Sequence, residues 1–532
     1  MGVLAGMEPE GVFRFFEEIA GIPHGSGNVG QISDYLVQFA RERNLFCVQD
    51  DLKNVIIIKE ASRGYEAEPP VILQGHMDMV AVKKPDCDVD LKTQGLRLAV
   101  EGDKLYAEGT SLGGDDGIAV AYCLALLDSH SIRHPRLEVV ITVDEEVGMD
   151  GARGIDLSVL TGNRMINLDS EEEGIFLTSC AGGARVRCLF PAKRSEAEGF
   201  VCEIVLGGLQ GGHSGAEIHR ERGNANCLMA RALWNLSNRL PIRLVSVKGG
   251  LADNAIPRET RAVVLVPKGC EVFERMEERP EDPTLFDEVL EDFGMEVQDE
   301  LLTRDPGFTL RWSRNAAEGR IGNVDADGGM GFHCHWKGKA PEVQKVRAFS
   351  AEDTKRAAAA LFALPGGVQA MSADMPGLVE TSLNLGILET EERDTDAEAL
   401  PENTAVLAAE LSVRSSVESA KNALIERLKA IVALAGGSSV VTGDYPGWQY
   451  RKDSPLREKM IRVYEEAYGA KPRVEAIHAG LECGILGSKI ADLDCVSIGP
   501  DMQDIHTTEE TLSISSTKRV WDYLVRLLET RD

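Results

Sequence analysis

The amino-acid sequence predicts an α/β protein in which an α+β domain is inserted into a domain built on a mostly parallel sheet. At 532 residues the chain is too long for one compact core, so at least two domains are expected. Helical and strand patterns alternate up to residue 184 and again from residue 444, whereas the residues between them have the pattern of an antiparallel sheet. We therefore predict one discontinuous domain, 1–184 and 444–532, and a second domain at 185–443.

The elements of the discontinuous domain follow from its apolar runs. Runs bounded by turn or polar residues predict strands at 54–58, 71–75, 137–143 and 164–168. The apolar stretch GIAVAYCLALLDS, which begins at Gly117, is long enough for a buried helix. Periodicity predicts further helices at 9–20, 30–43, 454–468 and 517–530. Because functional groups gather beyond the carboxyl ends of parallel strands, polar residues at these ends are candidates for a site.

The elements of the inserted domain have half-exposed strand patterns. VRCLF, FVCEIVLGG and RAVVLVP are typical of antiparallel strands, and NANCLMARALWNLSNRL predicts a helix. Residues 271–305 contain 14 acidic and 3 basic side chains, which is typical of a solvated surface segment.

Composition excludes several classes of function. A net charge of −29 argues against nucleic acid and against an anionic membrane surface, since binding to phosphates depends largely on Lys and Arg. No apolar run approaches the roughly 18 residues of a membrane span, and no signal peptide is visible, so we expect a cytoplasmic protein. The eleven cysteines contain no CxxC pair and predict free thiols.

Five polar clusters stand at strand ends or in Gly-rich turns. Each alone is weak evidence, because an isolated HxD or a pair of aspartates in a turn is usually structural. Together they predict a metal site, since crowded carboxylates repel one another unless cations neutralise them. Two histidines and several carboxylates without thiolates suit two divalent ions such as zinc, cobalt or manganese. The clusters are His76 with Asp78, Asp115 with Asp116, Asp144 to Glu146, Asp169, and His506.

The order of motifs resembles a metallopeptidase family that contains aminoacylases, carboxypeptidase-type enzymes and dipeptidases. The motifs are GHMDM, DDG, DEEVGMDGA, LDSEE, GGHSG and HTTEE. More closely, FFEEIAGIPHGSGN, VILQGHMDMV, GLVETSLNLG and IHAGLECG resemble the cytosolic non-specific (aminoacyl-histidine) dipeptidases of that family. The resemblance runs from about residue 8 to the C-terminus and implies hydrolysis of Xaa-His and other unblocked dipeptides.

The resemblance also implies a role for each residue of the metal site. One ion would be held by His76, Asp115 and Asp169, and the other by Asp115, Glu146 and His506, with Asp115 bridging the two. Asp78 would orient His76, and Glu145 would be the general base, although the residues alone do not choose between Glu145 and Glu146. The family pattern further implies a cis peptide bond between Asp115 and Asp116.

The inserted domain would be the lid of this family and would move as a unit. By resemblance, His213 in GGHSG would donate to the oxyanion, and Asn254 and Arg414 would hold the substrate. His478, with Glu482 in HAGLE, would line the pocket. An extra acidic insertion at about 268–372 separates two pieces that together resemble an ordinary lid.

Three alternatives remain open. The protein could be an aminoacylase or amidohydrolase acting on N-acyl amino acids, or an inactive metal-binding scaffold, although no predicted ligand or base is missing. The insertion could be a second lid-like unit that lets His213 reach the metals of its own chain. It could instead be an acidic addition to a protein that forms a homodimer through its lid.

Overall fold

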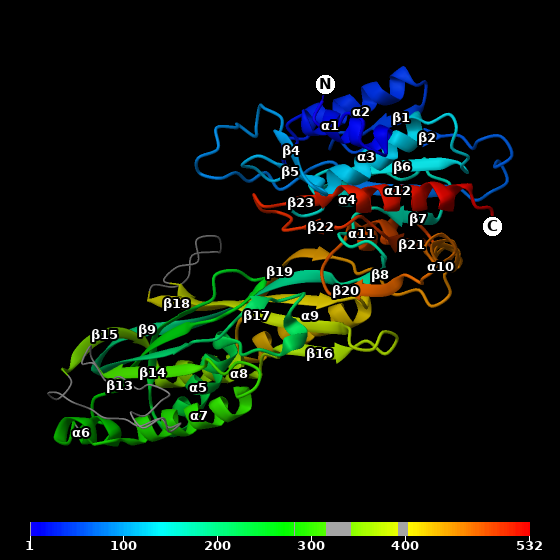
Figure 1. The fold of residues 1–532 in the computed structure, drawn as a ribbon. Helices are drawn as coiled ribbons and strands as arrows, with labels where there is room; N and C mark the ends of the chain where they lie inside the picture. Colours follow the sequence, from blue (N-terminus) through cyan, green and yellow to red (C-terminus); the bar gives the residue numbers. More distant parts are fainter. Residues whose placement is uncertain (1, 281, 315–341, 392–402) are drawn as a thin grey trace. The chain divides into compact units, whose positions relative to one another are not determined.

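A computed structural model describes the chain except for residues 1, 281, 315–341 and 392–402 (Figure 1). The chain divides into two compact units. The first unit comprises Met1–Cys180 and Pro446–Asp532, and the second unit comprises Ala181–Tyr445. These divisions fall close to the predicted domain boundaries, and the connectivity is that of one segment inserted into another.

The first unit is built on an eight-stranded sheet. Its centre is parallel, because β3 (Val71–His76) pairs in parallel with both β6 (Leu137–Thr142) and β7 (Arg164–Asn167). One edge is antiparallel, where β1 (Phe46–Gln49) and β2 (Val55–Lys59) continue from β6. The predicted α/β class is confirmed, with a mixed rather than a wholly parallel sheet. Beyond β7 the order continues with β21 (Asp494–Ser497), β8 (Ile175–Cys180) and β20 (Arg473–Ile477).

Helices of the first unit pack with this sheet in one hydrophobic core. The predicted buried helix is α3 (Gly114–Asp128), which is buried along nearly its whole length. The core also contains α1 (Glu10–Ala20), α2 (Gly30–Glu42), α10 (Pro455–Tyr468) and α12 (Ile514–Glu529). Two shorter helices of the unit are α4 (Asp150–Gly154) and α11 (Glu482–Lys489).

A small four-stranded sheet ties the C-terminal part of the first unit to its N-terminal part. β23 (Thr511–Ser513) pairs with β5 (Lys104–Ala107), which in turn pairs with β4 (Leu98–Glu101). β22 (Met502–Gln503) pairs with β23, so the loop between them is held close to the segment around residue 105. That loop contains His506.

The second unit is organised around one long strand, β9 (Gly182–Gly207). The sequence patterns VRCLF and FVCEIVLGG predict two separate strands. This prediction is wrong, because both patterns lie on the single strand β9. The polar stretch between them stays extended because residues 194–199 pair with β15 (Gln344–Phe349). The remaining strands of this sheet are β11 (Arg243–Gly249), β13 (Thr260–Pro267), β14 (Thr309–Arg314), β16 (Gly367–Met371), β17 (Val379–Glu391), β18 (Thr404–Ser415) and β19 (Ser438–Tyr445).

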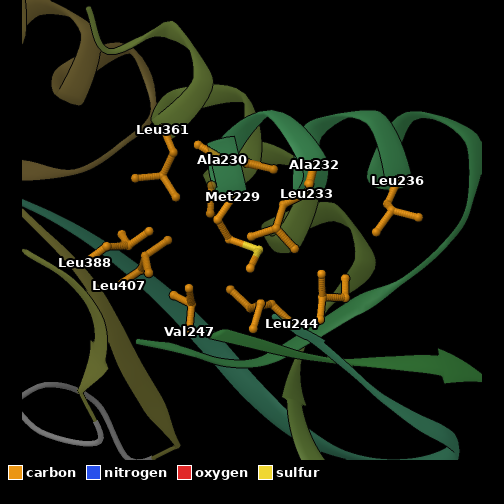
Figure 2. Packing of buried hydrophobic residues seen from close by; sticks show 14 of the residues in the cluster. Met229, Ala230, Ala232, Leu233, Leu236, Leu244, Val247, Leu361, Leu388 and Leu407 are labelled. Atoms are coloured by element: carbon orange, nitrogen blue, oxygen red, sulfur yellow. The ribbon is translucent and has the colours of Figure 1, made fainter. Parts of the chain in front are cut away.

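The core of the second unit lies between this sheet and its helices (Figure 2). Met229 and Leu233 of α5 (Ala225–Arg239) lie over Val247 of β11, with Leu388 and Leu407 from neighbouring strands in the same cluster. The helix at NANCLMARALWNLSNRL is therefore present as predicted. The other elements are α6 (Glu271–Glu278), α7 (Leu285–Leu301), α8 (Ala351–Ala363), α9 (Glu418–Leu434), η1 (Ile218–Arg220), β10 (Gly212–His213) and β12 (Ala255–Ile256).

The described part of the predicted acidic insertion, 268–372, shares the sheet and core of the second unit. β14 and β15 both hydrogen-bond to β9, and α7 and α8 both contact α5. The buried Arg314 side chain of β14 pairs with the buried Asp287 carboxylate of α7, whose other oxygen accepts the Trp312 indole N–H at 3.0 Å. Residues 315–341 of the insertion lie outside the described residues.

Two expectations from composition can be compared with the structure. The search for a helix long and apolar enough to cross a membrane finds none among the described residues. The described cysteines are free thiols, as the absence of CxxC pairs predicts. Many of them are buried, among them Cys123, Cys180 and Cys483.

Candidate functional site

The predicted metal ligands of the first unit lie at the carboxyl ends of adjacent strands. His76 is the last residue of β3, Asp169 follows β7, and Glu146 follows β6. Because β6, β3 and β7 are neighbours in parallel, their ends meet at one edge of the sheet. Asp115 lies in the first turn of α3, and His506 lies in the loop between β22 and β23.

The two histidines of this set meet at Asp115, and each also lies close to one further carboxylate. The His76 Nε2 atom lies 3.1 Å from Asp115 Oδ1 and 3.7 Å from Asp169 Oδ1. The His506 Nε2 atom lies 3.0 Å from Asp115 Oδ2 and 3.0 Å from Glu146 Oε1. Each oxygen of Asp115 therefore faces a different histidine, as a bridging carboxylate would.

Asp116 is also close to these groups, which the predicted ligand set does not include. The structure contains two sets of potential ligands, and within each set the ligand atoms lie within 4.8 Å of one another. One set is His76, Asp116 and Asp169, and the other is His76, Asp115 and Glu146. The Asp115–Asp116 peptide bond is cis, as expected. The buried Asp116 carboxylate accepts the backbone N–H of His76 on Oδ2 at 3.2 Å.

The charges of the site are strongly perturbed. Burial raises the pKa of Asp116 and Glu145 well above their usual values and raises the pKa of Asp169 to about 7. Burial acts in the same direction on Asp115, but hydrogen bonds from His506 and His76 hold the pKa of Asp115 below its usual value. Hydrogen bonds to Asp115 and Glu146 raise the pKa of His506 to about 10. The cluster thus favours added positive charge, in the form of protons or cations.

The donor set fits divalent metal ions. Imidazole and carboxylate ligands are those that zinc, cobalt and manganese accept. The buried Asp116 Oδ1 atom makes no hydrogen bond within the described residues, and a nearby cation would compensate for its burial. The observed geometry is consistent with the predicted ligands without assigning each one.

Asp78 connects His76 to the turn that carries Glu145. Its main-chain carbonyl lies 3.0 Å from His76 Nδ1, and its carboxylate Oδ1 lies 3.5 Å from the same nitrogen. Asp78 Oδ1 also accepts the backbone N–H of Glu145 at 3.1 Å, and Oδ2 accepts the Ser26 hydroxyl at 2.8 Å. The structure therefore places Asp78 where it can orient both the imidazole and the Glu145 turn.

Sequence reasoning gave no role to Ser26 or Glu510 and only a tentative one to Glu482. Glu482 is buried beneath the site, where its Oε2 atom accepts from Gln74 Nε2 at 2.6 Å and Thr142 Oγ1 at 2.5 Å, and burial raises its pKa to about 8. His478 is buried in the loop between β20 and α11, four residues before Glu482. These residues are part of the motifs PHGSG, HAGLE and HTTEE, but the motifs do not indicate which contacts the residues make.

The histidine of GGHSG, in the second unit, is held in one tautomer. His213 Nδ1 accepts the backbone N–H groups of Ala216 at 3.0 Å and Gly215 at 3.3 Å. Because this nitrogen is an acceptor, the proton of the neutral imidazole is on Nε2. Burial and the nearby Arg414 guanidinium lower the pKa of His213, which favours this neutral form.

Asn254 and Arg414 belong to the same part of the second unit as His213. The Asn254 carbonyl accepts the backbone N–H of Ser214 at 2.8 Å, and β10 pairs with β12 just beyond it. Arg414 lies on β18, and its effect on the pKa of His213 places its charge near the imidazole. Three of the four residues predicted to bind substrate are therefore in the second unit, whereas the fourth, His478, belongs to the first.

Comparison with known proteins identifies the family. Residues 72–530 match the sequence profile of peptidase family M20/M25/M40. The chain belongs to this family. The family prediction is thereby confirmed, and the M20 peptidase is a hydrolase.

Two relatives match this M20 peptidase over nearly its whole length. It is 33% identical over 531 residues to the cytosol non-specific dipeptidase of Escherichia coli K12, covering 99% of each chain. The crystal structure of aminoacylhistidine dipeptidase from Vibrio alginolyticus matches with a TM-score of 0.84 and 33% identity, over 100% of this chain and 98% of that one. An aminopeptidase PepT from Bacillus cereus shares the fold, with a TM-score of 0.55 at 14% identity.

Proposed function

We propose that this M20 peptidase hydrolyses dipeptides, including Xaa-His and other unblocked Xaa-Xaa substrates. The observation that carries the proposal is the Asp115 carboxylate, whose two oxygens face His76 and His506. The Glu145 carboxyl lies close enough to Asp169 and Glu146 for their charges to contribute to its raised pKa, after burial as the main cause. The names of the two relatives, both dipeptidases, support the substrate class.

The metal centre is proposed to hold two divalent ions. His76, Asp115 and Asp169 would bind one ion, and Asp115, Glu146 and His506 the other, with zinc the first choice and cobalt or manganese as alternatives. When bound, such ions supply Lewis acidity that makes water a nucleophile near neutral pH and stabilises the oxyanion.

The protein residues would move the proton and hold the peptide. Glu145 would take the proton from the attacking water and deliver it to the leaving amine, with its backbone N–H fixed by Asp78. His213 would donate its Nε2–H to the developing oxyanion, since its Nδ1 atom is already occupied as an acceptor. Arg414 would bind the C-terminal carboxylate and Asn254 the peptide backbone, while His478 would line the pocket.

The second unit would then act as a lid that closes on the peptide. The partner of the enzyme would be a small peptide rather than nucleic acid or membrane, and the name of the E. coli relative supports a cytosolic location. A homodimer formed through the lid remains the alternative to a site completed within one chain.

A substrate panel tests the proposal. Metal-loaded protein would be assayed against Xaa-His, other dipeptides, a tripeptide and N-acetyl amino acids, with Glu145→Gln as the inactive control. We expect turnover of free dipeptides and little of the other two classes. A preference for N-acetyl amino acids would replace the proposal with the aminoacylase alternative, and metal binding without any turnover would favour the inactive scaffold.

A further inference from the structure

The Glu510 carboxylate accepts hydrogen bonds from the loop that opens α3. Its Oε2 atom accepts the backbone N–H groups of Leu112 at 2.8 Å and Gly113 at 3.2 Å. Its Oε1 atom accepts those of Gly114 at 2.8 Å and, more weakly, Asp115 at 3.5 Å. The side chain is only 4% exposed, so these backbone donors take the place of water.

The two loops that Glu510 joins carry two of the three ligands proposed for one ion. Asp115 belongs to the loop whose backbone N–H groups bind Glu510. His506 is four residues before Glu510, in the loop between β22 and β23. His506 has a positive φ of 63°, a conformation that few residues other than glycine adopt readily, and its side chain is 43% exposed. Such a backbone conformation persists only where surrounding contacts determine it.

We propose that Glu510 is a positioning residue for the metal centre, which fastens the loop of Asp115 to the loop of His506. The inference rests on the proposed ligand set and adds a residue that touches neither metal nor substrate. A single carboxylate fixes the spacing between Asp115 Oδ2 and His506 Nε2, the two atoms that lie 3.0 Å apart. One ion of the pair therefore depends on Glu510 more than the other.

A carboxylate suits this position because all its neighbours in the loop are donors. Both of its oxygens accept, whereas the amide of glutamine would place an N–H₂ group against backbone N–H groups. The start of α3 adds the partial positive charge of a helix N-terminus, which favours an anion there. Glu510→Gln keeps the size of the side chain and removes only about half of its accepting capacity.

Glu509 offers a matched control in the next position. Its carboxylate is exposed and pairs with the exposed Lys84 side chain at 2.7 Å. Glu509→Gln therefore makes the same chemical change in the same motif without touching the loop of Asp115.

Cobalt(II) titration of metal-free wild type, Glu510→Gln and Glu509→Gln, followed by visible absorption and by metal analysis after dialysis, tests the inference. We expect wild type and Glu509→Gln to bind two ions, and Glu510→Gln to bind one of the two about 10–100-fold more weakly. With zinc, kcat should fall in Glu510→Gln while KM changes little. A purely structural role would lower the Tm of Glu510→Gln without changing its affinity for either ion.

A second variant covers the case in which Glu510→Gln does not fold. Glu510→Asp keeps the charge but is one methylene shorter, so it should bind the second ion with intermediate affinity. Two ions bound at wild-type affinity in a folded variant at position 510 would overturn the inference. Failure of wild-type protein to bind two ions would instead overturn the proposed function, so the two failures are distinguishable.

Discussion

The two groups of candidate residues, one in each unit, differ in their electrostatics. The first is crowded with buried carboxylates, and the second is a neutral histidine that is already hydrogen-bonded. The site of the first unit gathers His76, His506 and several carboxylates, among which burial raises the pKa of Asp169 to about 7. The His213 group of the second unit is satisfied by its own loop, because backbone N–H groups occupy His213 Nδ1. The carboxylates of the first group favour a bound cation, whereas the tautomer of His213 is fixed by hydrogen bonds within the second unit.

This difference indicates how the two units would divide the work of the reaction. Repulsion among buried carboxylates costs stability until a cation is bound, so the first site would be stabilised by the proposed metal ions. A donor whose tautomer is already fixed needs no reorganisation when an oxyanion forms. We therefore expect metal removal to disturb the first unit and to leave the His213 loop unchanged.

Removing the metals should have the largest effect. Chelation should abolish turnover, and at free zinc of about a thousand times Kd the loss of binding should lower the free energy of unfolding by about 4 kcal/mol. Hydrogen exchange followed by mass spectrometry should show faster exchange at residues 112–116 and 504–510, with no change at 211–217. Equal changes in exchange in both units would contradict the inference that metal binding stabilises only the site of the first unit.

Glu145→Gln should reduce kcat by about 10²–10⁴-fold or more, because it removes the proposed base without removing a proposed ligand. Metal analysis should still find two ions per chain. Asp150→Asn is the matched control, since Asp150 is an exposed carboxylate a few residues away. Near-normal turnover by Glu145→Gln would rule out its role.

His213→Ala should lower kcat by about 10²–10³-fold with unchanged metal content, as expected for loss of one oxyanion donor. His219→Ala, which changes an exposed histidine of the same loop region, should be close to wild type. Mixing Glu145→Gln chains with His213→Ala chains tests whether His213 acts at the metal site of its own chain or at that of a partner chain. Recovered activity would require a site completed across subunits, whereas its absence in proven mixed dimers would support a site within one chain.

The smallest effect concerns the protonation state of His213 and involves no loss of rate. With ¹⁵N-labelled histidine, NMR should show the neutral Nε2–H tautomer at pH 7, with His213→Ala used for assignment. Because burial and Arg414 lower its pKa, the imidazole should become half protonated only below pH 6.5, the usual value. An Nδ1–H tautomer would contradict the proposed donor.

The sequence predicted which polar residues lie together better than it predicted the contacts that hold them. His76 and Asp169 were found because an apolar run ends next to each, which places them at one edge of a parallel sheet. Glu510 was missed because its partners are backbone amides nearly 400 residues away, and amides leave no pattern in side-chain types. Ser26, whose hydroxyl donates to the Asp78 carboxylate from 52 residues away, was missed because one serine and one aspartate so far apart form no pattern in the sequence.

The fold shows the same limit. The helices at 10–20 and 455–468 were predicted from periodicity alone, and in the structure the Ser454 hydroxyl also caps α10. The antiparallel edge formed by β1 and β2 could not be predicted, because an apolar strand has the same pattern in either direction. The unbroken β9 was missed because β15, more than 140 residues later, supplies the pairing that its polar middle lacks.

The split connectivity of the first unit has a consequence for synthesis and truncation. Chains emerge from the ribosome N-terminus first, and domains generally fold as units. The second unit, contiguous from Ala181 to Tyr445, is complete while the first unit still lacks β20, β21 and α12. His506 is made after the whole second unit, so a chain that stops between the two can contain a finished second unit but no complete set of the proposed metal ligands.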